Sequence, residues 1–207
     1  VPGAGGAGAD GADRGDAGAH EVPDDTSRKC LPAMTSEALH ARSTSQFTPN
    51  DQYFRSQPQL RKIKAPEAWV MTDGHPDVVV AVIDVGVDLD HEDLKDAIWV
   101  NKNEIPNNKK DDDKNGFVDD VHGWNFVENT NDPEPQFTEG FQDVAVSHGT
   151  WIAGIIGARK NNGKGIAGLA SGVTIMPIRA VDDLGKARSD HAVRAILYAA
   201  ENGADII

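Results

Sequence analysis

The feature that most constrains this chain is an apolar run, Val78 to Ile83, with Asp77 before it and Asp84 after it. Five of its six residues are β-branched, and apolar residues do not alternate with polar ones. Such a run is typical of a strand that is buried on both faces, as in a parallel sheet covered by helices on both sides. We therefore expect a buried strand with the carboxylate of Asp84 at its carboxyl end.

The residues that follow alternate between strand and helix patterns. We expect strands over residues 123–127, 173–181 and 204–207, and helices over residues 65–70, 148–158 and 189–202. Ser189 is the expected N-cap of the last helix, and Gly203 the residue that ends it. This alternation predicts the α/β class, a parallel sheet with helices on both faces. In such sheets, sites form at the carboxyl ends of the strands.

The N-terminal residues have a different composition. Residues 1–20 contain seven Gly, six Ala and three Asp, with no large apolar side chain after Val1. Such a segment cannot offset the entropy that ordering would cost. We therefore expect a disordered arm with a linker or propeptide remnant over residues 1–46, an extended run from Phe47 to Lys64, and one domain over residues 47–207.

Charge and composition exclude several classes of protein. The net charge is −13, and residues 111–143 contain ten acids and one base. Nucleic-acid binding is disfavoured because it needs a basic surface. The longest apolar run is too short for a transmembrane segment. The single Cys30 excludes a disulfide framework within the chain and a cysteine-based zinc site.

Two motifs carry the chemistry. The first is Val82-Ile83-Asp84-Val85-Gly86-Val87-Asp88, and the second is Ser147-His148-Gly149-Thr150-Trp151-Ile152-Ala153-Gly154. An acid at the end of a strand and a histidine at the start of a helix suit the orienting half of a nucleophilic triad. There the carboxylate fixes the histidine tautomer, and the imidazole takes the proton of the nucleophile.

From about Phe47 to Ile207 the chain resembles the subtilases, the subtilisin-like serine peptidases. The resemblance rests on both motifs, in the family's order, and on Ala65-Pro66-Glu67-Ala68-Trp69, His91-Glu92-Asp93-Leu94, Asn161 to Gly168, and Gly203 to Ile207. It implies a subtilisin-like fold and a serine endopeptidase in which Asp84 is the acid and His148 the base.

The resemblance also implies what this chain lacks. The family's serine and its oxyanion-hole asparagine come after the position that Ile207 occupies, so we expect a truncated catalytic domain, inactive by itself. Ser147, Ser171 and Ser189 are the only serines from Asp84 onward, and none has the sequence setting of a nucleophile.

Two departures from the family motifs favour an alternative. Val85 stands where the family usually has Ser or Thr, and Trp151 stands where it usually has a second histidine. The alternative is a catalytically inactive, calcium-dependent binding module with a subtilase fold.

One substrate-binding element matches the family. Gly185, Lys186 and Ala187 follow the strand expected at 173–181, where the family places an edge that pairs with the substrate backbone. Backbone pairing tolerates varied side chains. An ordinary turn between a strand and a helix explains the same residues equally well.

The acidic segment contains part of a calcium-loop pattern. Asp111, Asp113 and Asn115 alternate with other residues and precede Gly116, as in the first half of an EF-hand loop. The twelfth position is His122 rather than Glu, so the pattern is incomplete. A solvated acidic loop is the alternative.

A second calcium site is implied by resemblance to calcium-stabilised subtilases. The matching side chains are Asp51, Asp93 and Asn162, and the matching backbone carbonyls are those of Arg159, Lys164 and Ile166. A weaker match places a further site at Asn125, Glu128, Asp132 and Glu134. The oxygen ligands suit calcium rather than zinc.

For the complete enzyme the resemblance implies a polypeptide substrate and a monomer. Export from the cell is expected, because millimolar external calcium would fill weak sites.

Overall fold

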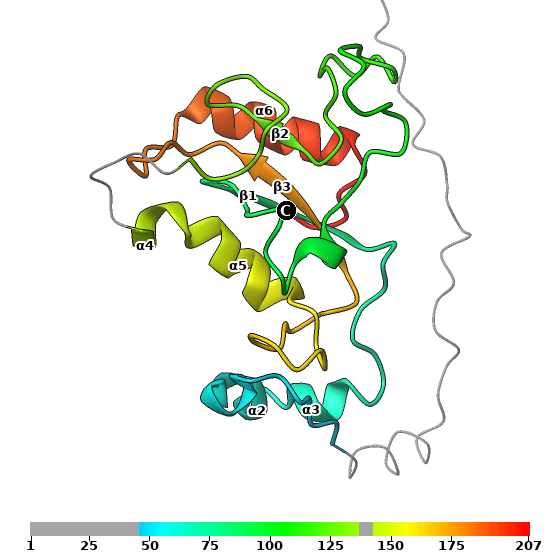
Figure 1. Ribbon diagram of the computed structural model, residues 1–207, viewed down its shortest axis with the longest axis vertical. Coiled ribbons are helices and arrows are strands. Elements are labelled where there is room, and N and C mark those ends of the chain that lie inside the picture. Colours follow the sequence, from blue (N-terminus) through cyan, green and yellow to red (C-terminus); the bar gives the residue numbers. More distant parts are fainter. Residues whose placement is uncertain (1–45, 137–142) are drawn as a thin grey trace, which may run out of the picture. The chain divides into compact units, whose positions relative to one another are not determined.

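The computed structural model describes residues 46–136 and 143–207. Its core is a parallel sheet in the order β1-β3-β2, formed by Val79–Asp84, Thr174–Arg179 and Trp124–Asn125 (Figure 1). Asp84 is paired with Arg179 at the carboxyl ends of β1 and β3. The α/β class and the parallel sheet predicted from the sequence are confirmed.

Helices cover both faces of the sheet. α5 (His148–Gly157) packs on one face and α6 (Ser189–Glu201) on the other (Figure 1). Alternate residues of β1 supply the two sides: Val80 and Val82 belong to the core under α5, and Ala81 to the core under α6. The unbroken apolar run of β1 follows from this double burial.

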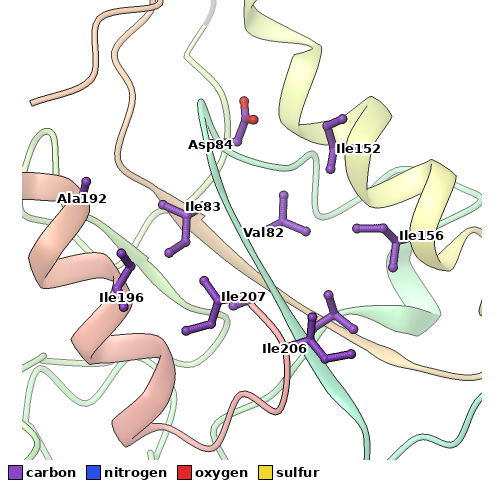
Figure 2. A pocket seen from close by; sticks show the side chains of 11 residues that line it. Val82, Ile83, Asp84, Ile152, Ile156, Ala192, Ile196, Ile206 and Ile207 are labelled. Carbon is purple, nitrogen blue, oxygen red and sulfur yellow. The ribbon is translucent and has the colours of Figure 1, made fainter. Parts of the chain in front are cut away.

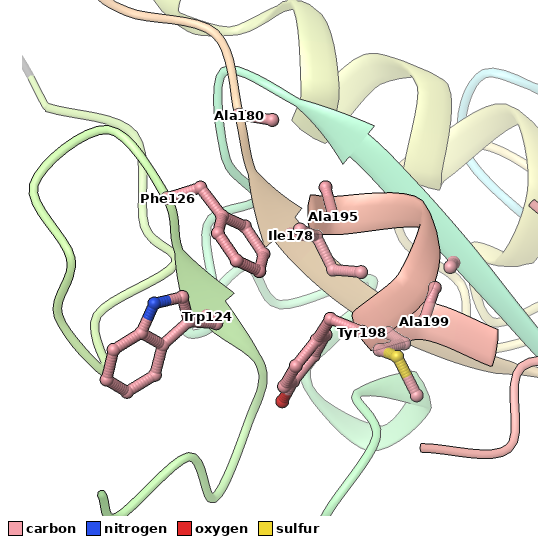
Figure 3. Close-up of a cluster of buried hydrophobic side chains, with 9 residues drawn as sticks. Trp124, Phe126, Ile178, Ala180, Ala195, Tyr198 and Ala199 are labelled. Carbon is pink, nitrogen blue, oxygen red and sulfur yellow. The ribbon is translucent and has the colours of Figure 1, made fainter. Parts of the chain in front are cut away.

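The core under α6 is aromatic. Trp124, Phe126 and Tyr198 gather there with Ile178 of β3 (Figure 3). Phe117 makes edge-to-face contacts with the three aromatic rings at centroid distances of 4.8 to 5.7 Å. These contacts join the loop before β2 to the last helix.

The N-terminal part of the described chain forms short helices. α2 spans Pro58–Lys62 and α3 spans Ala65–Ala68, with a 3-10 turn at Phe54–Ser56 before them. α3 confirms the helix expected there, but the extended run expected from Phe47 to Lys64 is wrong, because Pro58 begins a helix rather than interrupting a strand. A third apolar cluster, of Phe54, Leu60, Ala65, Trp69 and Ala167, holds these helices.

The remaining elements are short. A 3-10 turn at Lys95–Ala97 follows β1, and α4 (Asp143–Val146) precedes α5. Two expectations need correction. α6 begins at Ser189, so its N-cap is Arg188 and not Ser189. Residues 204–207 form a single parallel bridge, between Ile206 and Val80, rather than a strand.

The arm predicted over residues 1–46 lies outside the described residues, except for Gln46. Within the described part of the chain, no helix is both long and apolar enough to cross a bilayer.

Candidate active site and metal-binding loops

Asp84 is held where β1 ends. Its main-chain oxygen accepts hydrogen bonds from the N–H groups of Ala180 and Val181, at 2.9 and 3.1 Å. Its side chain accepts one from the N–H of Val85 on Oδ1, at 2.8 Å. The other carboxylate oxygen, Oδ2, lies 2.8 Å from Nδ1 of His148. The structure therefore brings together the two predicted catalytic residues, which are 64 positions apart in the sequence.

Gly149 allows the start of α5 to approach the end of β1. A Cβ at this residue would lie 2.2 Å from the carbonyl oxygen of Gly86 and 3.0 Å from Cβ of Asp84. Beside it, Oγ1 of Thr150 accepts a hydrogen bond from the N–H of Asp88 at 3.0 Å. The glycine and threonine after His148 thus fix the helix against the loop that leaves β1.

The Asp84–His148 contact determines what the imidazole can do. An ionised carboxylate only accepts hydrogen bonds, so Nδ1 of His148 carries the proton and Nε2 of the neutral ring is an acceptor. The side chain of His148 is 56% exposed, whereas that of Asp84 is 17% exposed. Nε2 can therefore accept a proton from an incoming group while Asp84 stabilises the imidazolium that forms.

The serines of this part of the chain do not supply an obvious nucleophile. Ser171 is buried before the amino end of β3, at the opposite end of the parallel sheet from Asp84. Ser189 begins α6, and Ser147 directly precedes His148.

An apolar groove runs along the outer edge of β1 between α5 and α6 (Figure 2). Of the described residues that line it, Asp84 alone is charged. The lining residues are Val80 to Asp84, Ile152, Ile156, Ala192, Ile196, Ile206 and Ile207. Sequence reasoning did not identify this groove, because it needs the strand edge and both helices in place.

The stretch predicted to pair with substrate forms a hairpin beside this site. Val181 and Ala187 make an antiparallel bridge, and the N–H of Asp182 donates to the carbonyl of Lys186 at 3.1 Å. Gly185, Lys186 and Ala187 are exposed. The hairpin, residues 181–187, thus presents an exposed turn after β3.

The calcium site implied by the family resemblance involves side chains that lie close to one loop, residues 161–166. Nδ2 of Asn162 donates to Oδ1 of Asp93 at 2.7 Å. The two oxygens of Asp51 accept from the N–H groups of Asn161 and Asn162, at 2.7 and 3.4 Å. Asp51 and Asp93 are 5% and 2% exposed. Two buried carboxylates thus flank one loop, and each accepts hydrogen bonds from it.

The residues predicted to contribute carbonyls border the same acids. The N–H of Arg159 donates to the main-chain oxygen of Asp93 at 2.9 Å, and the N–H of Ile166 donates to its Oδ2 at 3.0 Å. The N–H of Lys164 donates to Oδ1 of Asn162 at 2.8 Å. A Cβ at Gly165 would lie 2.1 Å from Oδ2 of Asp93, so the loop approaches this acid closely.

The acidic segment folds into a loop around a residue that the sequence pattern missed. Ligand atoms of Glu104, Asp111 and Asp113 lie within 4.8 Å of one another. Oε1 of Glu104 also accepts hydrogen bonds from the N–H groups of Asp112 and Asp113, at 2.8 and 3.2 Å. The sequence motif did not indicate Glu104, because this residue precedes the Asp-x-Asp-x-Asn-Gly pattern. This cluster could hold a metal ion.

The third predicted ligand of this loop, Asn115, also connects the loop to Asp120. Its Nδ2 donates to Oδ2 of Asp120 at 3.0 Å, and the Tyr198 hydroxyl donates to the same oxygen at 2.6 Å. Burial raises the pKa of Asp120, although these hydrogen bonds and one from Asn101 oppose it. Burial and the adjacent Asp120 raise the pKa of Tyr198 far above its usual range. The acidic loop is thus tied to α6.

The weaker calcium match divides into two groups. Nδ2 of Asn125 donates to Oε2 of Glu128 at 3.1 Å, whereas Oδ1 of Asp132 accepts from the N–H of Glu134 at 3.0 Å. Among the residues with described positions, the three acids Glu128, Asp132 and Glu134 do not form a cluster of metal ligands.

Comparisons with known proteins show the family of this chain. The model of the Subtilase family matches residues 75–207. The chain is 35% identical to thermitase of Thermoactinomyces vulgaris over 162 residues, which cover 78% of this chain and 47% of thermitase. It is 33% identical to the thermophilic serine proteinase of a Bacillus species over 162 residues, covering 78% of this chain and 33% of that protein.

A third relative is named as extracellular. The chain is 31% identical to the halolysin-like extracellular serine protease Nep of Natrialba magadii over 159 residues, which cover 77% of this chain and 25% of that protein. The chain spans about half the length of thermitase and a smaller share of the other two relatives.

Proposed function

The chain belongs to the subtilase family, and from that premise we propose that it supplies the acid and the base of an Asp-His-Ser triad to a serine endopeptidase. The observation that carries the proposal is the 2.8 Å contact between Nδ1 of His148 and Oδ2 of Asp84. It joins a partly buried carboxylate to an exposed imidazole, as a general base requires.

In this mechanism His148 accepts the proton of a serine hydroxyl on Nε2 as the serine oxygen attacks the scissile carbonyl. Asp84 keeps the imidazole in the required tautomer and stabilises the positive charge that develops on it. His148 then returns the proton to the leaving amine. The hairpin at residues 181–187 offers main-chain groups to which an extended polypeptide substrate could pair.

The nucleophile in this proposal comes from a polypeptide segment other than residues 84–207. The groove along β1 is a suitable place for that segment to pack, because it is apolar and reaches Asp84 at one end. The exposed side chains of Ile196, Ile206 and Ile207, which line the groove, would be buried by such packing.

The test is to label the full-length protein with a fluorophosphonate, a reagent that modifies an activated serine. We expect labelling of the wild type and its loss in His148→Ala. His75→Ala is the matched control, because His75 also faces an aspartate, Asp77, but does so at an exposed turn away from β1's carboxyl end. Equal labelling of His148→Ala and the wild type would refute the assigned base. If the wild-type full-length protein is not labelled, the proposed peptidase activity is refuted.

The inactive binding module is the second candidate function, motivated by Val85. A valine removes the hydroxyl that usually supports the catalytic acid in the family. In this chain the N–H of Val85 still donates to Oδ1 of Asp84. The carboxylate therefore keeps a supporting donor, which favours the peptidase over the module.

We also propose that calcium binds at two places. Asp51, Asp93 and the Asn162 side-chain oxygen, with carbonyls of Arg159, Lys164 and Ile166, would hold one ion, and Glu104, Asp111 and Asp113 another. Both donor sets consist of hard oxygens, which suit calcium. Each carboxylate retains lone pairs beyond its present hydrogen bonds. A bound cation would neutralise the acids. It would also link segments of the chain that are distant in sequence.

Export follows as part of the same proposal, supported by the name of the relative from Natrialba magadii. The complete enzyme is proposed to act as a monomer on polypeptides.

A further inference from the structure

The hairpin at residues 181–187 determines its own shape but not its orientation. Oδ1 of Asp182 accepts hydrogen bonds from the N–H groups of Leu184 and Lys186, at 2.9 and 2.8 Å. Gly185 closes the turn by donating to the carbonyl of Asp182 at 2.9 Å. These contacts are all internal to the hairpin. A contact with the body of the domain is therefore needed to fix the direction in which its exposed edge faces.

Arg179 provides such a contact. Its guanidinium is 1% exposed, and Nη2 forms an ion pair with Oδ1 of Asp183 in the hairpin. Nη1 lies 3.5 Å from Oε2 of Glu128, in the loop after β2. Asn125 holds the same Glu128 oxygen at 3.1 Å. One buried cation thus joins the end of β3, the loop after β2 and the hairpin.

The same residue is adjacent to the Asp84–His148 pair through the main chain. Arg179 is the register partner of Asp84, and the next two N–H groups, of Ala180 and Val181, donate to the carbonyl of Asp84. The base of the hairpin is therefore attached to the residue that orients His148. A change in hairpin tilt would move a paired substrate relative to Nε2.

Physical chemistry favours a firm hold by this guanidinium. A buried charge is costly unless it is paired, so Arg179 strongly favours conformations in which Asp183 stays against it. The planar fork of an arginine can face two carboxylates at once, whereas a lysine ammonium cannot reproduce that geometry. We propose that Arg179 is a positioning residue that aligns the substrate-pairing hairpin with the Asp84–His148 pair, a role that rests on the proposed peptidase function.

The test compares a tetrapeptide substrate with a small fluorophosphonate reagent. Both are applied to the full-length protein carrying Arg179→Lys or Asp183→Asn. A tetrapeptide amide needs the hairpin edge, whereas a small fluorophosphonate needs only the activated serine. We expect kcat/KM for the tetrapeptide to fall by up to about 10²-fold, the loss that a misplacement of about 1 Å can cause. The rate of fluorophosphonate labelling should stay within about twofold of the wild type, because labelling does not use hairpin pairing.

Arg188→Lys is the matched control. Arg188 also pairs with an aspartate, Asp190, next to the hairpin, but both side chains are more than half exposed. This variant should leave both rates unchanged. Equal losses on the tetrapeptide and the fluorophosphonate in the Arg179 and Asp183 variants would overturn the proposal, and so would no loss on either.

Amide hydrogen exchange gives a readout that does not depend on activity. Exchange at residues 182–187 should become faster in Asp183→Asn and Arg179→Lys, while exchange in the loop 161–167 stays unchanged. Unchanged exchange in the hairpin would overturn the positioning role. If Arg179→Lys does not fold, Asp183→Asn decides the question, since Asp183 lies on the hairpin itself. Lack of labelling of the wild type would instead refute the peptidase function, and the exchange result would still stand.

Discussion

Asp84 receives hydrogen bonds from three segments of the chain. The N–H of Val85 donates to Oδ1, Nδ1 of His148 faces Oδ2, and Ala180 and Val181 donate to the main-chain oxygen. The position of this carboxylate is therefore set by its own strand, by α5 and by β3 together. Because these contacts hold the residue in place, an isosteric substitution of Asp84 should keep its position and remove only its negative charge.

Replacing Asp84 by asparagine should separate those two effects. An asparagine amide can donate to Nδ1 of His148, which favours the tautomer that leaves Nε2 protonated and unable to act as a base. We expect kcat of the full-length protein to fall about 10⁴-fold with little change in KM. Steady-state kinetics on a peptide amide measure this. Asp88→Asn, in the same loop, is the control, and a comparable loss there would contradict the assignment.

Gly149 should be intolerant of even one methyl group. An added Cβ would lie 2.2 Å from the Gly86 carbonyl oxygen, which is backbone and cannot move aside easily. We expect Gly149→Ala to lower the free energy of unfolding by about 3 kcal/mol through overpacking. In the same helix, a Cβ at Gly154 would lie 3.6 Å from Cδ1 of Ile166. Gly154→Ala should therefore be neutral or stabilising by up to about 1 kcal/mol.

Chemical denaturation of the two variants beside the wild type measures the difference. Similar stability of Gly149→Ala and Gly154→Ala would mean that the approach of α5 to β1 is less tight than the structure has it.

At the scale of elements, long periodic patterns were predictable and local starts were not. The runs that became β1, β3, α5 and α6 were recognised because burial on one or two faces leaves a pattern in the sequence. Ser189 was wrong as a cap because a serine also suits the first helical turn. The prediction of a full strand at residues 204–207 was wrong, because apolar content alone does not reveal how many hydrogen bonds form between strands. Glu104 was missed because three-dimensional proximity brings it to the acidic loop.

The two proposed calcium sites belong to different loops and should be lost independently. Isothermal titration of the folded protein should give one fewer bound ion in Asp93→Asn and one fewer in Asp113→Asn, with each variant keeping the other site. Chelation should lower the melting temperature, because calcium at about 100 times its Kd stabilises the native state by about 2.7 kcal/mol. An unchanged ion count in either variant would remove that site from the proposal.

The loop around Glu134 should show a pH dependence of stability. Burial raises the pKa of Glu134, the hydrogen bond from the Leu89 N–H opposes this, and the nearby carboxylates of Asp132, Asp88 and Asp90 raise it further. A folded-state pKa above the unfolded value means that stability is greatest below the unfolded pKa. That stability declines as the pH rises through the folded-state pKa. A glutamine at this position would avoid the decline and keep the oxygen that accepts the Leu89 N–H.

We therefore expect Glu134→Gln to be more stable than the wild type at pH 7 in the presence of a chelator. The gain should be no more than about 1 kcal/mol, because solvent screens a partly exposed group. The difference should vanish below about pH 4, where a normal glutamate is protonated. Thermal melts at both pH values measure it. A destabilised variant at pH 7 would mean that Glu134 makes favourable contacts in its charged form.

At the scale of the whole described domain, burial is uneven around the sheet. Both faces of β1 and β3 are covered, yet the outer edge of β1 opens into the apolar groove. Ile196 and Ile206, on its walls, are 47% and 53% exposed. Contiguous apolar surface of this kind is typical of interaction sites and ligand-binding grooves. Asp84 and His148, the proposed catalytic pair, lie at the carboxyl end of the same strand, so any segment that fills the groove approaches them.

This openness leads to a prediction for the 207-residue chain taken by itself. The fluorescent probe ANS should bind the groove, because ANS binds exposed apolar surface. Ile196→Ser and Ile206→Ser should each reduce its emission, since both side chains line the groove. Ile105→Ser is the control: Ile105 is 61% exposed but lies in the loop before the acidic segment. Near-ultraviolet circular dichroism should show that all variants remain packed. Equal emission from the three variants would show that ANS responds to general loosening rather than to the groove along β1.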